Sequence, residues 1–151
     1  MSYLITKVDE GFYRSPRPTK DQLAQWKLTY GIGAILNLEG DAPEAVRIEK
    51  TDCNQLGIDE SYMRWSGANR PSVEAVIEGV ELIRANQKAK IITLGHCLHG
   101  VDRTGILCAG YHIIYEGWDV EKAWQEAISF GLHWYVYWWW RKTLVELKGG
   151  E

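Results

Sequence analysis

Residues 90–105 read KIITLGHCLHGVDRTG, and this stretch decides the fold. Its beginning, Lys90 to Leu94, is rich in β-branched side chains and predicts a central buried strand. The loop that follows contains Gly95 and Gly100, and a helix is predicted to begin at about Arg103. Ligands of α/β proteins bind beyond the carboxyl ends of parallel strands. We therefore expect the functional site in this loop.

Strands and helices alternate on both sides of this stretch. Thr19 and Gln22 form a capping-box pattern, so the first helix is expected to begin near Lys20. Further strands are predicted at residues 3–8, 12–14, 32–38 and 60–65, and helices at 20–30, 43–56, 72–86, 103–116, 119–130 and 134–147. This alternation predicts an α/β fold with a central, mostly parallel sheet of about four to five strands flanked by helices.

Length and composition narrow the class of protein. The chain has 151 residues and a formal charge of −3, so we expect a single domain over residues 1–151 and no nucleic-acid partner. Three cysteines argue against a disulfide scaffold, and no apolar run is long enough for a membrane span. The N-terminus lacks a signal-peptide pattern. As written, the chain is expected to be cytoplasmic, and secretion of a longer precursor is not excluded.

The loop after the central strand has the composition of an anion site. Backbone N–H groups of residues 98–103, which include Leu98, His99, Gly100 and Val101, can surround one tetrahedral anion at a helix N-terminus. Arg103 offers a planar fork for two phosphate oxygens. Cys97 is expected at the centre, where positive charge favours its thiolate and makes it a nucleophile. Thr104 can donate to the sulfur, and His96 is expected to hold the loop shape.

The motif resembles the HCxxGxxR(S/T) signature of the cysteine-dependent phosphatases. The segments FYRSPRPTKDQLAQW and IGAILNLEGD resemble the compact dual-specificity group, and the resemblance covers roughly residues 12 to 147. It implies a dual-specificity-phosphatase-like fold and a phosphomonoesterase that works through phosphocysteine, without metal or cofactor. A pseudophosphatase that binds phosphate without turnover is a remote alternative.

Two subgroups resemble the chain most. They are the atypical dual-specificity phosphatases, some of which act on inositol pyrophosphates, and the tyrosine-phosphatase-like phytases. The resemblance implies a phosphorylated small molecule, inositol polyphosphate, as substrate. The alternative is a phosphoprotein, through phosphotyrosine.

The sequence departs from this superfamily at its general acid. Most members carry an Asp about thirty residues before the Cys, whereas the corresponding loop here, SGANRP at 66–71, has no carboxylate. Gly67 stands about where the phytase-like Asp would fall. Asp102 is the leading substitute, as acid or as water-positioner, because myotubularin-like lipid phosphatases carry Asp in a similar GxDRT pattern. Its alternative role is to cap the helix. Weaker candidates near strand ends are Asp59, Glu60, Glu39 and Asp41.

Several basic residues are expected at the mouth of the site. Arg14 and Arg70 are candidate phosphate contacts, and Arg17 and Lys20 could add to a positive bowl. His99 is expected to point outward, toward a second phosphate or an aromatic ring. His133 is a candidate neighbour of the attacking water by resemblance.

Aromatic residues and two cysteines complete the set. The run WYVYWWW at 134–140 is expected to pack mainly in the core, with Trp134 and Trp138 facing inward. A rim of the site, a dimer contact and a membrane interface remain open for the others. Cys53 and Cys108 are expected to be packing residues.

Overall fold

Five strands form one sheet in the order β1-β2-β5-β3-β4. The structure is a computed structural model and describes residues 4–149. β2, β5, β3 and β4 run parallel, and β1 pairs antiparallel with β2. The strands are β1 (Thr6–Asp9), β2 (Phe12–Ser15), β3 (Ile32–Glu39), β4 (Asp59–Trp65) and β5 (Ile92–His96). The expected α/β class, with a mostly parallel sheet, is confirmed. Tyr3, part of the first predicted strand, lies outside the described residues.

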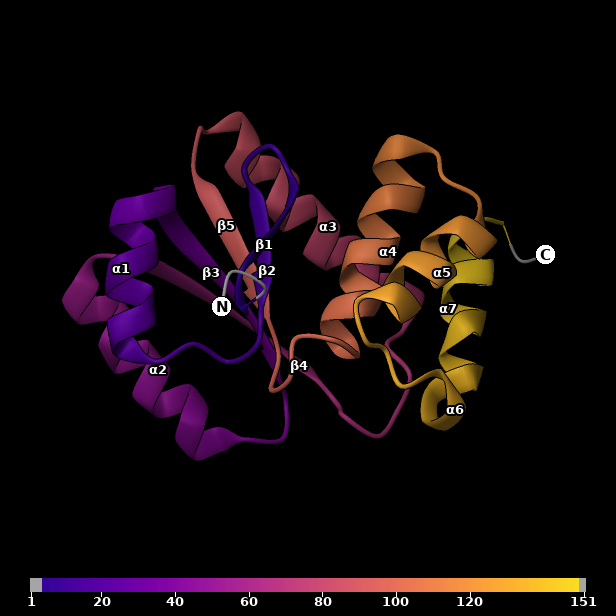
Figure 1. The fold of residues 1–151 in the computed structure, drawn as a ribbon, viewed down its shortest axis with the longest axis horizontal. Coiled ribbons are helices and arrows are strands. Elements are labelled where there is room, and N and C mark those ends of the chain that lie inside the picture. Colours follow the sequence, from indigo (N-terminus) through magenta and orange to yellow (C-terminus); the bar gives the residue numbers. More distant parts are fainter. Residues whose placement is uncertain (1–3, 150–151) are drawn as a thin grey trace.

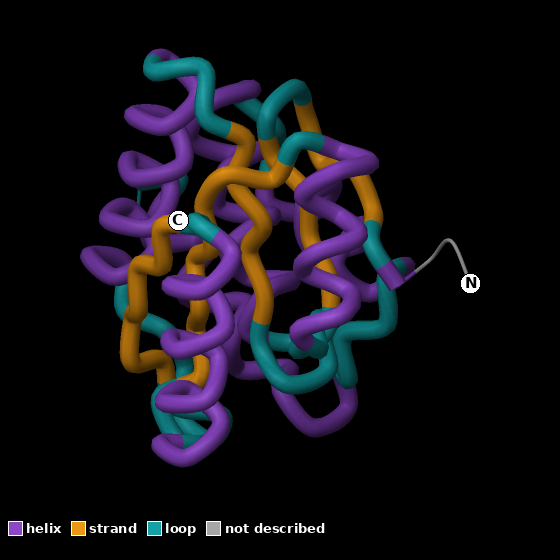
Figure 2. The backbone as a smooth tube through the Cα atoms, turned by 90° about the vertical axis from the view of Figure 1, so that its left-hand side faces the viewer, coloured by secondary structure: helices purple, strands orange, loops and turns teal. Residues whose placement is uncertain are grey.

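Helices cover both faces of the sheet (Figure 1). They are α1 (Lys20–Tyr30), α2 (Pro43–Leu56), α3 (Val73–Lys88), α4 (Arg103–Glu116), α5 (Val120–Ser129), α6 (Trp134–Tyr137), the 3-10 helix η2 (Trp138–Trp140) and α7 (Arg141–Leu147). α1 and α2 lie on one side, and Figure 2 looks at the molecule from that side. α3, α4, α5 and α7 lie on the other. The central strand β5 is therefore buried on both faces, as parallel strands usually are.

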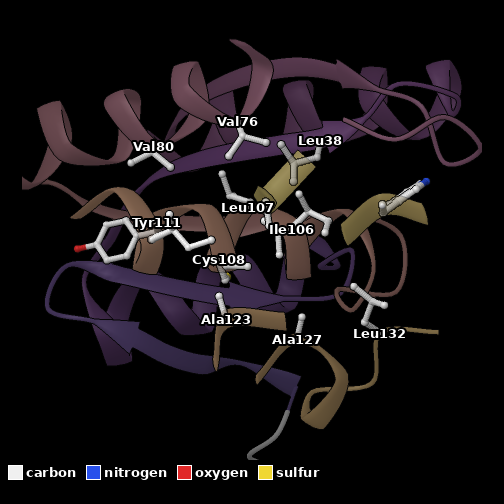
Figure 3. Packing of buried hydrophobic residues seen from close by; sticks show 14 of the residues in the cluster. Leu38, Val76, Val80, Ile106, Leu107, Cys108, Tyr111, Ala123, Ala127 and Leu132 are labelled. Atoms are coloured by element: carbon white, nitrogen blue, oxygen red, sulfur yellow. The ribbon is translucent and has the colours of Figure 1, made fainter. Parts of the chain in front are cut away.

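Each face of the sheet carries its own apolar core. The larger core packs α3, α4 and α5 against residues such as Leu36 and Leu38 of β3 (Figure 3). The smaller one joins Leu23 of α1 and Cys53 of α2 to Ile35 and Leu94 of the sheet. Because both faces of β5 and β3 are packed, the loop that leaves β5 starts from a fixed point.

Local signals explain most of the helix boundaries. The Thr19–Gln22 capping box is present at the start of α1. Ser72 caps α3 by accepting from Ala75 N–H. β5 differs from its prediction, since it begins two residues later, at Ile92. α3 continues to Lys88, and the chain then turns at Lys90, whose φ is 64°, so the strand cannot begin before this turn. β5 ends at His96, directly before Cys97.

The aromatic run near the C-terminus does not fold as one continuous helix. The four-residue helix α6 passes into η2 and then into α7. This change of helical pitch shifts the buried position to Trp140, which is 0% exposed and packs against Tyr137 in a tilted arrangement, with ring centroids 4.2 Å apart. Trp134 and Trp138 are 53% and 67% exposed. The prediction that these two tryptophans face inward is therefore wrong.

Candidate active site

The loop from Cys97 to Asp102 is held from outside through its carbonyl groups. Arg17 N–H donates to the Leu98 carbonyl at 3.1 Å, and Arg14 Nη2 donates to the Gly100 carbonyl at 3.0 Å. Within residues 4–149, the N–H groups of residues 98–102 have no acceptor in the protein. N–H groups without an acceptor in the protein are available to an anion.

Gly100 allows this loop to approach β2 closely. Its φ is 73°, in the left-handed region, and a Cβ there would lie 2.5 Å from Pro16 N and 2.6 Å from Ser15 O. Both the backbone conformation and the space exclude a side chain. The loop is thereby fixed against the end of β2.

Cys97 lies at the base of this loop, at the N-terminus of α4. Its side chain is buried, and Thr104 Oγ1 donates to Cys97 Sγ across 3.0 Å. A hydroxyl donor and a helix N-terminus both stabilise negative charge on sulfur. The structure thus brings together Cys97, Arg103 and Thr104 as their spacing predicts.

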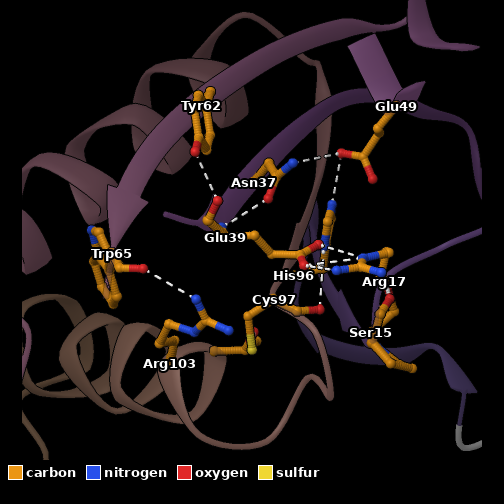
Figure 4. Close-up of polar contacts among 12 residues, drawn as sticks. Ser15, Arg17, Asn37, Glu39, Glu49, Tyr62, Trp65, His96, Cys97 and Arg103 are labelled. Atoms are coloured by element: carbon orange, nitrogen blue, oxygen red, sulfur yellow. Dashed lines mark hydrogen bonds and ion pairs between the residues drawn. The ribbon is translucent and has the colours of Figure 1, made fainter. Parts of the chain in front are cut away.

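Arg103 is anchored by two acceptors on one nitrogen. Its Nη1 donates to the Trp65 carbonyl at 3.1 Å, drawn in Figure 4, and to Asp41 Oδ1 at 3.0 Å. The side chain is largely buried. Both contacts use Nη1, so Nε and Nη2 remain on the edge of the guanidinium that can bind two oxygens of one phosphate.

Asp102 is paired with His133 and does not cap α4. The helix has no side-chain cap at this residue. The carboxylate instead accepts from His133 N–H at 2.8 Å and lies 3.0 Å from His133 Nδ1. The expected alternative role as a helix cap is therefore wrong, because the carboxylate faces the segment between α5 and α6. His133 therefore lies against Asp102, and its expected place near the attacking water stays a prediction.

His96 is fully buried and fixes the loop from the side of α2. Its Nε2 lies 2.8 Å from Glu49 Oε2, and its Nδ1 lies 3.4 Å from the Cys97 carbonyl (Figure 4). Glu39, on β3, is held by Arg17 Nε at 3.0 Å and lies 3.6 Å from His96 Nδ1. The expected loop-shaping role of His96 agrees with this network. Nothing in the sequence pattern identified Glu49 as its partner.

Two carboxyl groups share this buried network. Burial raises the pKa of Glu60 to about 8, and the nearby Glu49 carboxylate adds to the shift. Burial alone would also raise the pKa of Glu49, but the hydrogen bond to His96, the charge of His96, the hydrogen bond to Glu60 and the charge of Arg17 together outweigh burial, and the pKa is lowered. One carboxyl of this pair therefore carries a proton near neutral pH. This placement makes Glu60 a structural group on β4, paired with Glu49 of α2.

The basic residues expected at the mouth are engaged with the protein. Arg14 is only 4% exposed, and besides its bond to Gly100 it lies over the Phe130 ring at 4.6 Å. Arg70 donates to Glu146 at 2.9 Å and to Thr143 at 3.0 Å, which ties the 66–71 loop to α7. A contact of either guanidinium with substrate phosphate stays a prediction.

Lys20, expected to add to a positive bowl, donates a hydrogen bond to Gln55. His99 is exposed, as expected. His99 lines a hollow beside the loop, together with Arg14, Ser15 and Phe130.

Sequence reasoning missed Tyr137. Its hydroxyl donates to the Gly67 carbonyl at 3.0 Å. Burial raises the pKa of the phenol, the carboxylates of Asp102 and Asp41 raise it further, and Arg103 opposes them. The hydrogen bond to Gly67 holds Tyr137 against the 66–71 loop. The aromatic run at residues 134–140 contains no pattern that distinguishes Tyr137 from its neighbours, so its contact with the 66–71 loop could not be predicted.

The other two cysteines are confirmed as packing residues. Cys53 and Cys108 are buried in the two cores, and burial raises their pKa to about 12 and about 11. Within residues 4–149, no three His, Cys, Asp or Glu side chains are grouped as metal ligands would be. No helix in this range is long and apolar enough to cross a bilayer.

Solved structures share this fold at low sequence identity. Tk-PTP in its active form has a TM-score of 0.81 at 18% identity, over 98% of each chain. The core catalytic domain of the PP-IP phosphatase SIW14 from S. cerevisiae, in complex with citrate, has a TM-score of 0.72 at 22% identity, over 85% of this chain and 76% of that one. TpbA from P. aeruginosa in complex with pTyr has a TM-score of 0.70 at 22% identity, over 87% and 76%. No family model and no curated protein matches the sequence. The expected phosphatase-like fold is thus confirmed.

Proposed function

We propose that the chain is a phosphomonoesterase that forms a phosphocysteine intermediate at Cys97. The observation that carries this proposal is the hydrogen bond of 3.0 Å from Thr104 Oγ1 to Cys97 Sγ, at a helix N-terminus and beneath free backbone N–H groups. A sulfur that is buried, supplied with a donor and faced by an anion cradle has the surroundings of a nucleophile. A structural cysteine needs none of these features.

The reaction then has two steps. The Cys97 thiolate attacks phosphorus in line, the S–P bond forms, and the P–O ester bond breaks with its electron pair on the leaving oxygen. The loop N–H groups and Arg103 hold the phosphoryl oxygens as charge develops on them. In the second step water attacks phosphorus and the S–P bond breaks. Thr104 stabilises the departing thiolate, and Asp102 with His133 positions the water.

The substrate we favour is an aryl phosphate, with phosphotyrosine as the biological form. Two arginines of the expected positive bowl are paired with carboxylates, Arg17 with Glu39 and Arg70 with Glu146, which weakens the attraction for a polyphosphate. Exposed aromatic side chains, Trp134 among them, directly follow His133. The TpbA neighbour was solved with pTyr. Inositol polyphosphate, the substrate that the sequence favoured, is the alternative and has support from the PP-IP phosphatase SIW14.

Phosphate release from a panel of substrates tests both levels of the proposal. The panel contains phosphotyrosine and phosphoserine peptides, inositol hexakisphosphate, an inositol pyrophosphate and a phosphoinositide. We expect the highest kcat/KM on the phosphotyrosine peptide. Cys97→Ser is expected to lower kcat by at least about a thousandfold, whereas Cys108→Ser, a second buried cysteine, retains activity. Faster hydrolysis of inositol hexakisphosphate would overturn the substrate assignment. A folded wild-type protein that releases no phosphate from any of them would leave only phosphate binding.

A further inference from the structure

The 66–71 loop lies over the site but brings no carboxylate of its own. Gly67 is close enough to Arg103 that a Cβ at this position would lie 3.6 Å from Arg103 Cζ. The same Cβ would lie only 2.9 Å from Asp41 Oδ2. The carboxylate of Asp41 therefore occupies the space that a side chain at position 67 would need. Asp41 comes from the connection between β3 and α2, 26 residues earlier in the chain.

We infer that Asp41 is the general acid of this site and replaces, from another loop, the carboxylate that residue 67 lacks. The inference rests on the proposed phosphatase function and adds a catalytic residue to it.

The contacts of Asp41 fit this role. Oδ2 accepts from Gly67 N–H at 3.1 Å, and Oδ1 accepts from Arg103 Nη1 at 3.0 Å. The side chain is more than half exposed, so substrate can approach it. Asp41 precedes a helix but does not cap it, because α2 has no side-chain cap. A carboxylate that is positioned by two donors, one of them on Arg103, is held beside the guanidinium that would bind the phosphate.

The charge around Asp41 changes when substrate binds. Burial pushes the pKa of Asp41 upward, but the hydrogen bonds from Arg103 and from Gly67 N–H, together with the charge of Arg103, outweigh burial and hold the pKa below its usual range. A bound phosphate dianion offsets the charge of Arg103 and adds negative charge beside the carboxyl. Both changes favour the protonated acid in the complex. Asp102, the other candidate, is already committed to the His133 N–H and ring.

The proton and electron balance is complete without another group. As Cys97 Sγ bonds to phosphorus, the ester P–O bond breaks and the leaving oxygen takes the proton of Asp41. The resulting Asp41 carboxylate then accepts a proton from the attacking water, while the S–P bond breaks and the thiolate is restored. Each turnover returns Asp41 to its protonated form.

A leaving-group series tests the inference. We expect Asp41→Asn to lower kcat/KM for phenyl phosphate by about a hundredfold or more, and for 2,4-dinitrophenyl phosphate by less than about threefold, because only the poor leaving group needs a proton. Glu44→Gln, on the exposed first turn of α2, is the matched control and leaves both rates unchanged. An equal loss on both substrates would make Asp41 a positioning residue of Arg103 and overturn the inference. So would a leaving-group-dependent loss in Asp102→Asn instead.

A rescue experiment separates chemistry from folding. In an Asp41→Ala background the space beside Gly67 is open, and Gly67 has no positive φ that would resist a side chain. We expect Asp41→Ala/Gly67→Asp to recover at least about tenfold in phenyl phosphate hydrolysis relative to Asp41→Ala, and Asp41→Ala/Gly67→Asn to recover none. Equal rates in the two double variants would contradict the inference.

Failure of the inference differs from failure of the proposed function. If the wild type hydrolyses 2,4-dinitrophenyl phosphate and Cys97→Ser does not, the phosphatase proposal stands whatever Asp41 does. If the wild type hydrolyses neither aryl phosphate and none of the panel substrates, although it binds vanadate, both proposals fall.

Discussion

The anion cradle depends on one glycine whose conformation and surroundings both exclude a side chain. Gly100 combines a φ of 73° with backbone atoms of Ser15 and Pro16 within 2.6 Å of its missing Cβ. The motif predicted Cys97 and Arg103 because a short covalent spacing places them in one loop. The sequence offers Asp41 only as one of several weaker acid candidates, since its place beside Gly67 depends on how two separate loops pack. Residues of one loop can be placed from their spacing in the sequence, whereas a contact between two distant loops cannot.

Gly100→Ala is expected to cost more than the strain of a left-handed alanine. That strain alone is about 1–2 kcal/mol. Gly117→Ala supplies the matched control, because Gly117 has a φ of 72° with nothing within 4 Å of its Cβ. We expect Gly100→Ala to lower the free energy of unfolding in urea by about 1 kcal/mol more than Gly117→Ala. Only Gly100→Ala is expected to weaken vanadate binding, by at least about tenfold. Equal effects of both variants on stability and binding would contradict this account.

At the scale of elements, capping residues predict boundaries well and aromatic runs predict them poorly. α1 begins where Thr19 and Gln22 place it, because the capping box satisfies backbone donors locally. The segment from Trp134 to Trp140 changes helical type, so counting by 3.6 residues assigned the wrong tryptophans to the core. The hydrogen bond that joins β5 to α2, between His96 and Glu49, could not be predicted from any local sequence pattern either.

The carboxyl pair of Glu60 on β4 and Glu49 on α2 is expected to make stability depend on pH. The pKa of Glu60 is about 8 in the folded protein and about 4.3 in an unfolded chain. The folded state therefore binds this proton more tightly, and the stability it contributes is present in acid and is lost as pH rises through about 8. Glu60→Gln keeps a neutral side chain at every pH. Between about pH 5.5 and about pH 9, the Tm of Glu60→Gln is expected to fall by roughly 2–4 °C less than the Tm of the wild type. The difference is this small because Glu60 is partly exposed and solvent screens its charge.

Thermal unfolding followed by circular dichroism at both pH values checks this. Glu74→Gln, an exposed carboxylate in the first turn of α3, is the control and is expected to follow the wild type. If Glu60→Gln loses as much Tm as the wild type, the shared proton does not exist.

At the scale of the whole molecule, the net charge is −3, and several arginines around the site form ion pairs with carboxylates of the protein itself. Arg17 is paired with Glu39, Arg70 with Glu146 and Arg103 with Asp41. The sequence supplied the count of charges but not their pairing, which depends on the packed positions of β3, α7 and the loops. A site with one free anion cradle in a mildly acidic body suits one phosphoryl group better than many.

The eight tryptophans of the chain divide between core and surface, and this division is testable. Trp140 is fully buried on Tyr137, whereas Trp138, two residues earlier, is mostly exposed. We expect Trp140→Ala to lower the free energy of unfolding by about 3–5 kcal/mol, as large cavities do, and Trp138→Ala to change it by less than about 0.5 kcal/mol. Because Trp140 Nε1 has no partner within residues 4–149, Trp140→Phe is expected to cost clearly less than Trp140→Ala. Urea unfolding of the three variants decides the point, since equal costs for Trp138→Ala and Trp140→Ala would mean that the segment packs as a continuous helix.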